Sequence, residues 1–410
     1  MLVSKIARWF LLVMEVWIAG PILYLCILSV SAILMTKKRK AQTTSTGSAL
    51  ASAQFKFAIL IPAHNEEALL GHLLESLSGL TYPKELYTVY VVADNCTDAT
   101  AQLARATGWV HVYERFNNIK RGKGYALQWL LQKLEEDQLI YDAYIILDAD
   151  AEVVPTFLQS MAKELARGAQ ALQAQSTVLN ASESPGTALR WAALTLTGHV
   201  RSLGRSGLGA SSNLFGTGMC LSRTLLMRYP WQAFSTGEDY QYYLTLVLHG
   251  ERVHYVPEAV VRTHMPPTFA QMRTQDIRWE SWGQEHSKAH IALKLLQAGL
   301  KSRSFVPIEA LIELLIPPFS FLIGYCTLTL LASLLVRARD ALLLGLMLLA
   351  GLSCYVGTGL YLSRPPRMLY KALFYAPGFM IWKVWVYLVL SRSKKHTREW
   401  TRTSRPVSVD

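Results

Sequence analysis

The chain has 410 residues, of which 51% are hydrophobic and only 17% are charged, and it contains 11 tryptophans. This composition excludes an ordinary soluble protein, and the formal net charge of +12 favours an anionic neighbour such as a membrane surface or a phosphorylated ligand. Nucleic acid is disfavoured as a partner, because neither a zinc-ligand spacing nor a compact basic recognition helix occurs. The five cysteines show no CxxC spacing, which argues against a disulfide framework and suits a reducing cytoplasm.

An apolar segment occupies the start of the chain. The stretch from Trp9 to Met35 is long enough to cross about 30 Å of hydrocarbon, so we predict a transmembrane helix over residues 1–36. It is too long for a cleaved signal peptide. The basic run "TKKRK", residues 36–40, indicates that this end faces the cytoplasm, and residues 37–54 are predicted to be a linker.

Between residues 55 and 268, short runs rich in β-formers alternate with helical patterns. The sequence predicts strands at 55–64, 87–95, 109–115 and 143–150, and helices at 66–80, 98–107, 123–137 and 155–168. This alternation predicts an α/β domain with a Rossmann-like, mostly parallel sheet covered by helices on both faces. In such sheets ligands bind at the carboxyl ends of the strands.

The last third of the chain returns to apolar segments. Residues 308–363 are predicted to form two transmembrane helices, the first broken early by Pro317-Pro318, and residues 269–307 to form interfacial helices. Residues 364–410 are predicted to be an interfacial helix and a basic cytoplasmic tail. The stretch 371–391 is open between a span and an interfacial helix, but three spans place all the basic stretches on the cytoplasmic side. We therefore expect a multi-pass protein of the inner or plasma membrane with a cytoplasmic catalytic domain.

Two aspartates close the fourth predicted strand, in the stretch "YIILDADAEVVP". Residues i and i+2 of a strand project to the same side, so Asp148 and Asp150 are expected to face the ligand crevice together. Two carboxylates beside open space suit a Mg²⁺ or Mn²⁺ ion that bridges phosphates. A pair of helix caps is the alternative, although one cap needs only one carboxylate.

Polar residues also end the first two strands, in "LIPAHNEE" (60–67) and "VVADNCTD" (91–98). Acceptors at adjacent strand ends can hold the edge of a base and ribose hydroxyls, whereas Glu67 and Asp98 equally suit the first turns of helices. Lys123, between two glycines before a helical pattern, is placed to hold a phosphate. Neither a P-loop nor a dinucleotide fingerprint is present.

Two further clusters carry chemistry. Glu238 and Asp239 begin a helical pattern, where they serve either as capping residues or, for Asp239, as a general base. "QDIRW" combines Gln275, Arg278 and Trp279 within about one helical turn. Arg278 suits a departing diphosphate and Trp279 a sugar ring, while an amphipathic interfacial helix is the alternative interpretation.

The motifs "PAHNEE", "VVADNCTD", "RGKG", "DAD", "ED" and "QDIRW" occur in this order and are flanked by membrane segments. Together they resemble the membrane-bound family-2 glycosyltransferases, the group that contains cellulose, chitin and hyaluronan synthases and ceramide glucosyltransferases. The resemblance covers residues 55–282 and implies a glycosyltransferase-A fold with inverting transfer from a nucleoside-diphosphate sugar, dependent on Mn²⁺ or Mg²⁺. One departure is that the family's Thr-Glu-Asp reads Gly237-Glu238-Asp239 here.

The resemblance also implies roles for individual residues. Asp239 would be the base with Glu238 beside it, and Asp150 the main metal ligand with Asp148. The remaining roles are contacts to the nucleotide sugar by Pro62, Glu66, Asp94, Lys123 and Asp148, and contacts to the acceptor and diphosphate by Gly216, Thr217, Gly218, Gln275, Arg278 and Trp279. His264 is either a further metal neighbour or, more simply, a loop residue that makes a hydrogen bond.

These features lead to one expected activity with two acceptor classes. The first expectation is transfer from a UDP-sugar to a growing polysaccharide, and the alternative is transfer of one sugar to a membrane lipid such as ceramide or diacylglycerol. An inactive scaffold subunit ranks lower, because each motif is intact. Three spans are few for a polymer channel, so a polymer-forming enzyme would need a homo-oligomer or an export subunit.

Overall fold

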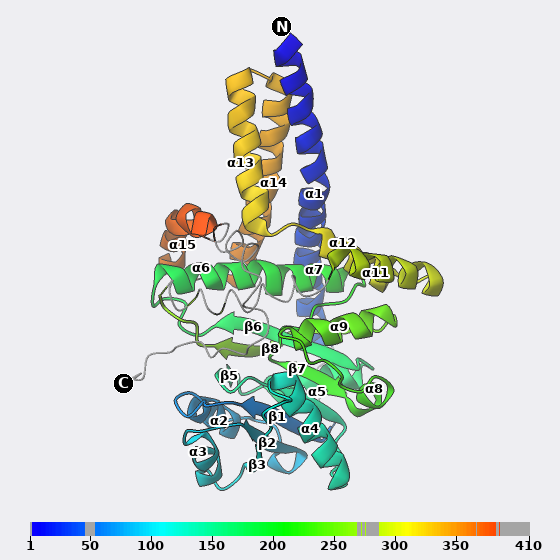
Figure 1. Ribbon diagram of the computed structural model, residues 1–410, viewed down its shortest axis with the longest axis vertical. Helices are drawn as coiled ribbons and strands as arrows, with labels where there is room; N and C mark the ends of the chain where they lie inside the picture. The colour runs from blue at the N-terminus through cyan, green and yellow to red at the C-terminus, as the bar shows by residue number, and fades with distance from the viewer. Residues whose placement is uncertain are drawn as a thin grey trace.

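The computed structural model of the protein describes residues 2–45, 54–268, 287–365 and 367–382, together with Met272, Gln275 and Trp385. Figure 1 shows three layers along the long axis of the molecule. The long helices stand side by side at the end that carries the amino terminus, shorter helices lie across their base, and an α/β domain forms the other end.

The long helices are α1 (Leu2–Ser45), α13 (Phe319–Val336) and α14 (Arg339–Ser363). Each is long and apolar enough to cross a membrane, which confirms the three predicted apolar helices, and they share one buried apolar core. Pro317-Pro318 separates α13 from a preceding helix, α12 (Phe305–Leu315), because proline lacks the N–H that would continue the hydrogen-bond ladder.

The first helix extends beyond its predicted end. α1 continues to Ser45, so the linker predicted for 37–54 is wrong for residues 37–45. Lysine, arginine, alanine and glutamine dominate residues 37–42, and all of them are good helix formers, so nothing ends the helix where the apolar pattern stops. Residues 46–53 lie outside the described part of the chain.

An eight-stranded sheet, in the order β3-β2-β1-β4-β7-β6-β8-β5, forms the centre of the α/β domain. Four of its seven pairings are parallel, namely β1 with β2 and β4, β2 with β3, and β6 with β8. The four predicted strands are confirmed as β1 (Phe57–Ala63), β2 (Tyr87–Asp94), β3 (His111–Arg115) and β4 (Ala143–Ile146). Sequence analysis did not identify β5 (Ala151–Val153), β6 (Ala171–Val178), β7 (Met219–Ser222) and β8 (Val253–Thr263).

Helices cover both faces of this sheet. The alternation of β1 shows the two faces, since Ile59 and Ile61 join one buried cluster and Ala58 and Leu60 the other. One face packs against α2 (Leu70–Ser78), α3 (Thr100–Ala106) and α5 (Phe157–Ala166), and the 3₁₀ turn η1 (Lys84–Leu86) precedes β2. The other face packs against α4 (Lys123–Glu136), α8 (Arg223–Arg228) and α9 (Glu238–Leu248).

A layer of short helices separates the α/β domain from the long helices (Figure 1). It contains α6 (Pro185–Leu194), the π-helical turn η2 (Thr195–Val200), α7 (Arg201–Gly207), α11 (Lys288–Ser302) and α12. A Cβ on Gly204 would lie 2.4 Å from the carbonyl oxygen of Leu28, so glycine is what lets α7 approach α1 this closely. α15 (Arg367–Ala372) and the 3₁₀ turn η3 (Leu373–Tyr375) lie beside α6, which favours the interfacial interpretation for this part of the 371–391 stretch.

Candidate active site

Lys123 joins three elements at the carboxyl ends of the strands. It is the first residue of α4, and its Nζ donates to Asp148 Oδ1 at 2.7 Å and to the carbonyl oxygen of Gly216 at 2.6 Å. Glu238 Oε1 lies 3.3 Å away. Burial alone would lower the pKa of Lys123, but the Asp148 and Glu238 carboxylates raise it above its ordinary value. The lysine is therefore a permanent cation among carboxylates.

The two aspartates of "DAD" lie in a turn and not on a strand. β4 ends at Ile146, residues 147–150 turn, and β5 begins at Ala151, so the strand-alternation argument for Asp148 and Asp150 is wrong in its premise. The turn nevertheless sets Asp148 beside Lys123 with its side chain 36% exposed. Its backbone N–H donates to Thr217 Oγ1 at 3.1 Å, which links this turn to the loop 215–219.

The loop "FGTGM", residues 215–219, is fixed in place by buried groups. Gln173, which is fully buried, donates to the carbonyl oxygen of Thr217 at 2.9 Å and accepts from the N–H of Phe215 at 3.0 Å. Gly218 has φ +68°, and a Cβ there would lie 2.7 Å from the side chains of Ala174 and Val261. Both the backbone conformation and the available space therefore require glycine at this position.

Asp239 faces this loop from the first turn of α9. A Cβ placed on Gly216 would lie 3.3 Å from Asp239 Oδ2 and 3.4 Å from Lys123 Nζ, so the three groups surround one small space. Asp239 Oδ1 also accepts from the Tyr240 N–H at 2.8 Å. Burial, and next the charge of Glu238, raise the pKa of Asp239 to about 7, while Lys123 opposes the shift. A carboxylate with a pKa near neutrality suits a general base.

The ends of β1 and β2 form the other side of the site. Asp94 is buried, and its Oδ1 accepts from Arg115 Nη1 at 2.5 Å and from Asn95 Nδ2 at 3.0 Å. His64 Nδ1 lies 2.7 Å from the Asp94 carbonyl oxygen, which ties the two strand ends together. Pro62 is tolerated in β1 because the pairing with β4 stops at Leu60, before the missing N–H is needed.

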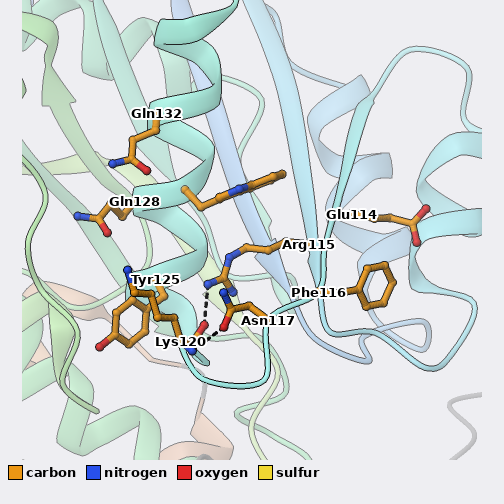
Figure 2. A pocket seen from close by; sticks show the side chains of 9 residues that line it. Glu114, Arg115, Phe116, Asn117, Lys120, Tyr125, Gln128 and Gln132 are labelled. Atoms are coloured by element: carbon orange, nitrogen blue, oxygen red, sulfur yellow. Dashed lines mark hydrogen bonds between the residues drawn. The ribbon is translucent and has the colours of Figure 1, made fainter.

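Glu66 follows β1 in the same region, and its backbone N–H donates to Thr100 Oγ1 at 2.8 Å. A pocket of about 280 Å³ adjoins this end of the site, between α4 and the segment after β3 (Figure 2). Arg115 lines it and donates to the Lys120 carbonyl oxygen at 2.6 Å, and Tyr125 and Trp129 supply aromatic surface from α4. Arg115 therefore lies between this pocket and Asp94.

The "QDIRW" cluster is only partly described. Gln275 is 5% exposed, and its Oε1 atom is buried without a hydrogen-bond partner among the described residues. Arg278 and Trp279 lie outside the described residues. His264 Nε2 lies 3.9 Å from Glu183 Oε2 in the loop after β8, which favours the simple loop interpretation over a metal role.

The structure therefore brings together Lys123, Asp148, the loop 215–219, Glu238 and Asp239, and it places Asp94 and Glu66 along the same strand ends. Sequence reasoning missed Arg115 and Gln173, which hold Asp94 and the loop. The charge at the end of β3 was a usable signal for Arg115. Gln173 gave none, because its strand was not recognised.

Lys123, Asp148, Glu238 and Asp239 thus gather at the carboxyl ends of the strands, the edge at which α/β sheets bind their ligands. The family model described as "Glycosyltransferase like family 2" matches residues 53–281, which is more than half of the chain. The chain belongs to this family of glycosyltransferases.

Among curated proteins, a "Beta-monoglucosyldiacylglycerol synthase" of Nostoc sp. is 31% identical over 173 residues, 41% of this chain and 36% of that protein. A protein of the same name from Synechocystis sp. is 25% identical over 68% of this chain and 60% of its own length. The matches thus span about a third to three fifths of these relatives. A mannosyltransferase of Pyrobaculum calidifontis, solved with GDP-Man and Mn²⁺, has the same fold, with a TM-score of 0.51, 16% identity and coverage of 93% of this chain and 100% of that one.

Proposed function

We propose that this glycosyltransferase transfers one sugar from a UDP-sugar to the hydroxyl group of a membrane lipid, with inversion at the anomeric carbon. The observation that supports the proposal is the space beside Gly216, where a point 3.3 Å from Asp239 Oδ2 is also 3.4 Å from Lys123 Nζ, so that a carboxylate and an ammonium group face one small volume. An acceptor hydroxyl beside Asp239 and a diphosphate beside Lys123 would both be within reach of one anomeric carbon, as a single displacement requires.

In this mechanism Asp239 removes the proton of the acceptor hydroxyl while that oxygen attacks the anomeric carbon. The bond from this carbon to the diphosphate breaks in the same step, and the nucleoside diphosphate leaves with the electron pair. Lys123 and the "QDIRW" cation, Arg278, would stabilise the growing negative charge, and preorganised groups of this kind are each worth about 3–4 kcal/mol. Pro62, Glu66 and Asp94 would hold the nucleoside, with Arg115 fixing the Asp94 carboxylate.

A divalent cation fits the residues at this site. Asp148 and Asp150 lie in one turn, and Mg²⁺ is typically held by one or two carboxylates together with substrate phosphates, so a complete protein cage is not needed. Indeed no cluster of three potential metal ligands occurs among the described residues. Bound there, Mn²⁺ or Mg²⁺ would neutralise the diphosphate. Asp150→Ala should weaken UDP binding in the presence of Mn²⁺, and unchanged affinity would exclude this role.

A lipid acceptor is favoured over the polysaccharide that the sequence put first. The relatives reported above carry the name of a diacylglycerol glucosyltransferase, and the described residues contain three helices able to span a membrane, few for a polymer channel. A polysaccharide acceptor stays the second candidate, because the same motifs serve both. It would require the homo-oligomer or export subunit noted above.

The surface of α11 supports a site that works against a bilayer. Leu293, Leu296 and Leu300 project from one side of this helix at 52%, 39% and 68% exposure, while Lys294 and Lys301 lie on the adjacent side. An exposed apolar stripe flanked by lysines is typical of a helix that lies in the membrane interface. We infer that the layer of short helices lies on the cytoplasmic leaflet, with the α/β domain on its cytoplasmic side and the lipid acceptor on its membrane side.

The test is transfer by the purified protein in lipid nanodiscs that contain diacylglycerol, with labelled UDP-glucose, other UDP-sugars and GDP-mannose as donors, with and without Mn²⁺. We expect label in a single glycolipid, UDP release that requires the cation, and loss of transfer in Asp239→Asn with donor affinity kept. Label in a long polymer would establish the second candidate instead. Normal turnover by Asp239→Asn would show that Asp239 is not the base.

A further inference from the structure

The side chain of one buried arginine near the site connects its own helix, α7, to α12, to α9 and to the segment that precedes the loop 215–219. Arg205, in α7, is 1% exposed. Its Nε and Nη2 atoms donate to the two carboxylate oxygens of Glu309 in α12, at 2.7 and 2.8 Å. Its Nη1 donates to Asn213 Oδ1 at 2.7 Å, and Nη2 also donates to the Tyr243 hydroxyl at 2.9 Å. All three guanidinium nitrogens are thus bonded, as a buried charge requires.

Two of these partners lead to the active site. Asn213 stands two residues before the loop 215–219, whose Gly216 bounds the space in front of Asp239. Tyr243 follows Asp239 by four residues in α9, so it lies on the same side of the helix one turn further on. Arg205 therefore holds both the loop and the helix between which the acceptor hydroxyl would lose its proton.

The third partner leads to the membrane helices. Glu309 Oε1 also accepts from the hydroxyl of Tyr24 at 2.6 Å, and Tyr24 belongs to α1. α12, which carries Glu309, continues through Pro317-Pro318 into α13. The arginine thus connects two long apolar helices to the two sides of the site.

We propose that Arg205 is a positioning residue for sugar transfer. Its hydrogen bonds fix the loop 215–219 and the first turns of α9 against the membrane helices, so that the Asp239 carboxylate is held in the correct orientation toward the acceptor hydroxyl. The inference rests on the proposed role of Asp239. A displacement of about 1 Å at a reacting centre can cost about 10²-fold in rate, so a rigid link of this kind has a measurable effect.

Stability is a poor explanation for this buried pair. Replacing a buried ion pair with apolar residues is often neutral or stabilising, because desolvation of two charges offsets their attraction. A buried pair can instead specify one geometry, and the forked guanidinium suits that task, since it directs several hydrogen bonds along fixed lines. The four hydrogen bonds from Arg205 to its three partners use this geometry fully.

A neighbouring pair offers a matched control. Arg201 and Glu313 lie one turn away on the same two helices, and Arg201 Nη1 donates to Glu313 Oε1 at 2.9 Å. Arg201 Nε also donates to the Tyr355 hydroxyl of α14 at 3.2 Å. This pair joins the layer of short helices to the membrane helices. Among the described residues, it makes no hydrogen bond to the loop 215–219 or to α9.

The experiment compares two variants. Each removes the uncharged hydrogen-bond partners of one arginine, but both keep the Arg205–Glu309 and Arg201–Glu313 ion pairs. Asn213→Ala with Tyr243→Phe frees the loop and α9 from Arg205, and Tyr355→Phe removes the equivalent partner of Arg201. With UDP-glucose in nanodiscs, we expect the first variant to lose about 10–100-fold in kcat with KM for the donor within about twofold, and the second to keep both. Arg205→Lys should show the same kcat loss, because an ammonium group keeps the charge but not the fork.

A second measurement does not depend on turnover. Amide hydrogen exchange should become at least about tenfold faster over residues 213–218 in Asn213→Ala with Tyr243→Phe, while exchange in α4 stays unchanged. Unaltered kcat, a loss confined to KM, an equal kcat loss in Tyr355→Phe, or unaltered exchange at 213–218 would each overturn the proposal. If the wild-type protein glycosylates no lipid, UDP release and the exchange data still decide it, so the two proposals fail separately.

Discussion

The ionisation of Asp239 should set the pH dependence of transfer. With a pKa of about 7, the Asp239 carboxylate, which we propose as the base, is about half ionised at pH 7 and only about a tenth ionised at pH 6. We therefore expect kcat/KM to be constant above about pH 8 and to fall about tenfold for each pH unit below 7. The midpoint reports the free enzyme, so it should be measured at low donor concentration by release of UDP.

The causes of this shift identify the perturbation. Burial raises the pKa of Asp239 most, and the charge of Glu238 adds to it. Glu238→Gln removes that charge and should move the midpoint to lower pH, whereas Glu251→Gln, at the Arg228 ion pair, should leave it in place. A midpoint that stays where it is in Glu238→Gln would refute the electrostatic account of the base.

The same shift also affects folding. A carboxyl group whose pKa rises from 3.8 to about 7 on folding costs no stability below pH 3.8; the cost grows as the pH rises from 3.8 to 7 and levels off above pH 7 at about 4 kcal/mol. Asp239→Asn removes this cost, so at pH 8 the variant should unfold at a higher temperature while transfer is lost. A lower melting temperature of the variant, measured by calorimetry, would contradict the raised pKa of Asp239.

Three further outcomes test other parts of the structure. Lys123→Met should weaken UDP binding by about 10–100-fold in titration calorimetry, since a charge-assisted hydrogen bond is worth about 1.5–3 kcal/mol, while Lys133→Met on the exposed side of α4 should not. Gly218→Ala should lower both melting temperature and activity, whereas Gly198→Ala, with open space around it, should change neither. His199, whose pKa burial lowers from 6.5 to about 4, should make the protein lose up to about 3 kcal/mol as the pH falls from 6.5 to 4, and chemical denaturation of His199→Gln should show a flatter profile.

Half of the sheet could be predicted because its strands are buried and bounded. β1, β2 and β4 are continuous apolar runs that end in polar residues, which is what parallel strands covered on both faces require. β6 mixes glutamine, serine and threonine with apolar residues, and β7 has only four residues. β8 contains a proline beside an irregularity in its pairing with β6, and proline argues against a strand in any local pattern.

The candidate site likewise contains some residues that the sequence pattern could predict and others that it could not. Asp94, Asp148 and Lys123 stand next to recognisable strand or helix ends, so their positions follow from local pattern and topology. Arg205 and Gln173 lie far along the chain from the groups that they hold, and only tertiary packing brings them there. Local periodicity contains no information about such partners, although two glutamates, Glu309 and Glu313, interrupt an apolar stretch of the sequence.

Charge balance explains why the base and the cation site should act together. Asp148, Glu238 and Asp239 contribute −3 when ionised and Lys123 contributes +1, so these four groups carry −2 before a donor arrives. Such a site repels a diphosphate unless a divalent cation accompanies it, because like charges in a partly buried crevice are poorly screened. Without the cation, the protein relieves the same excess by keeping Asp239 protonated up to about pH 7. In the proposed mechanism, a divalent cation held beside Asp148 would reduce this negative charge and so would lower the pKa of Asp239 and favour its ionised form.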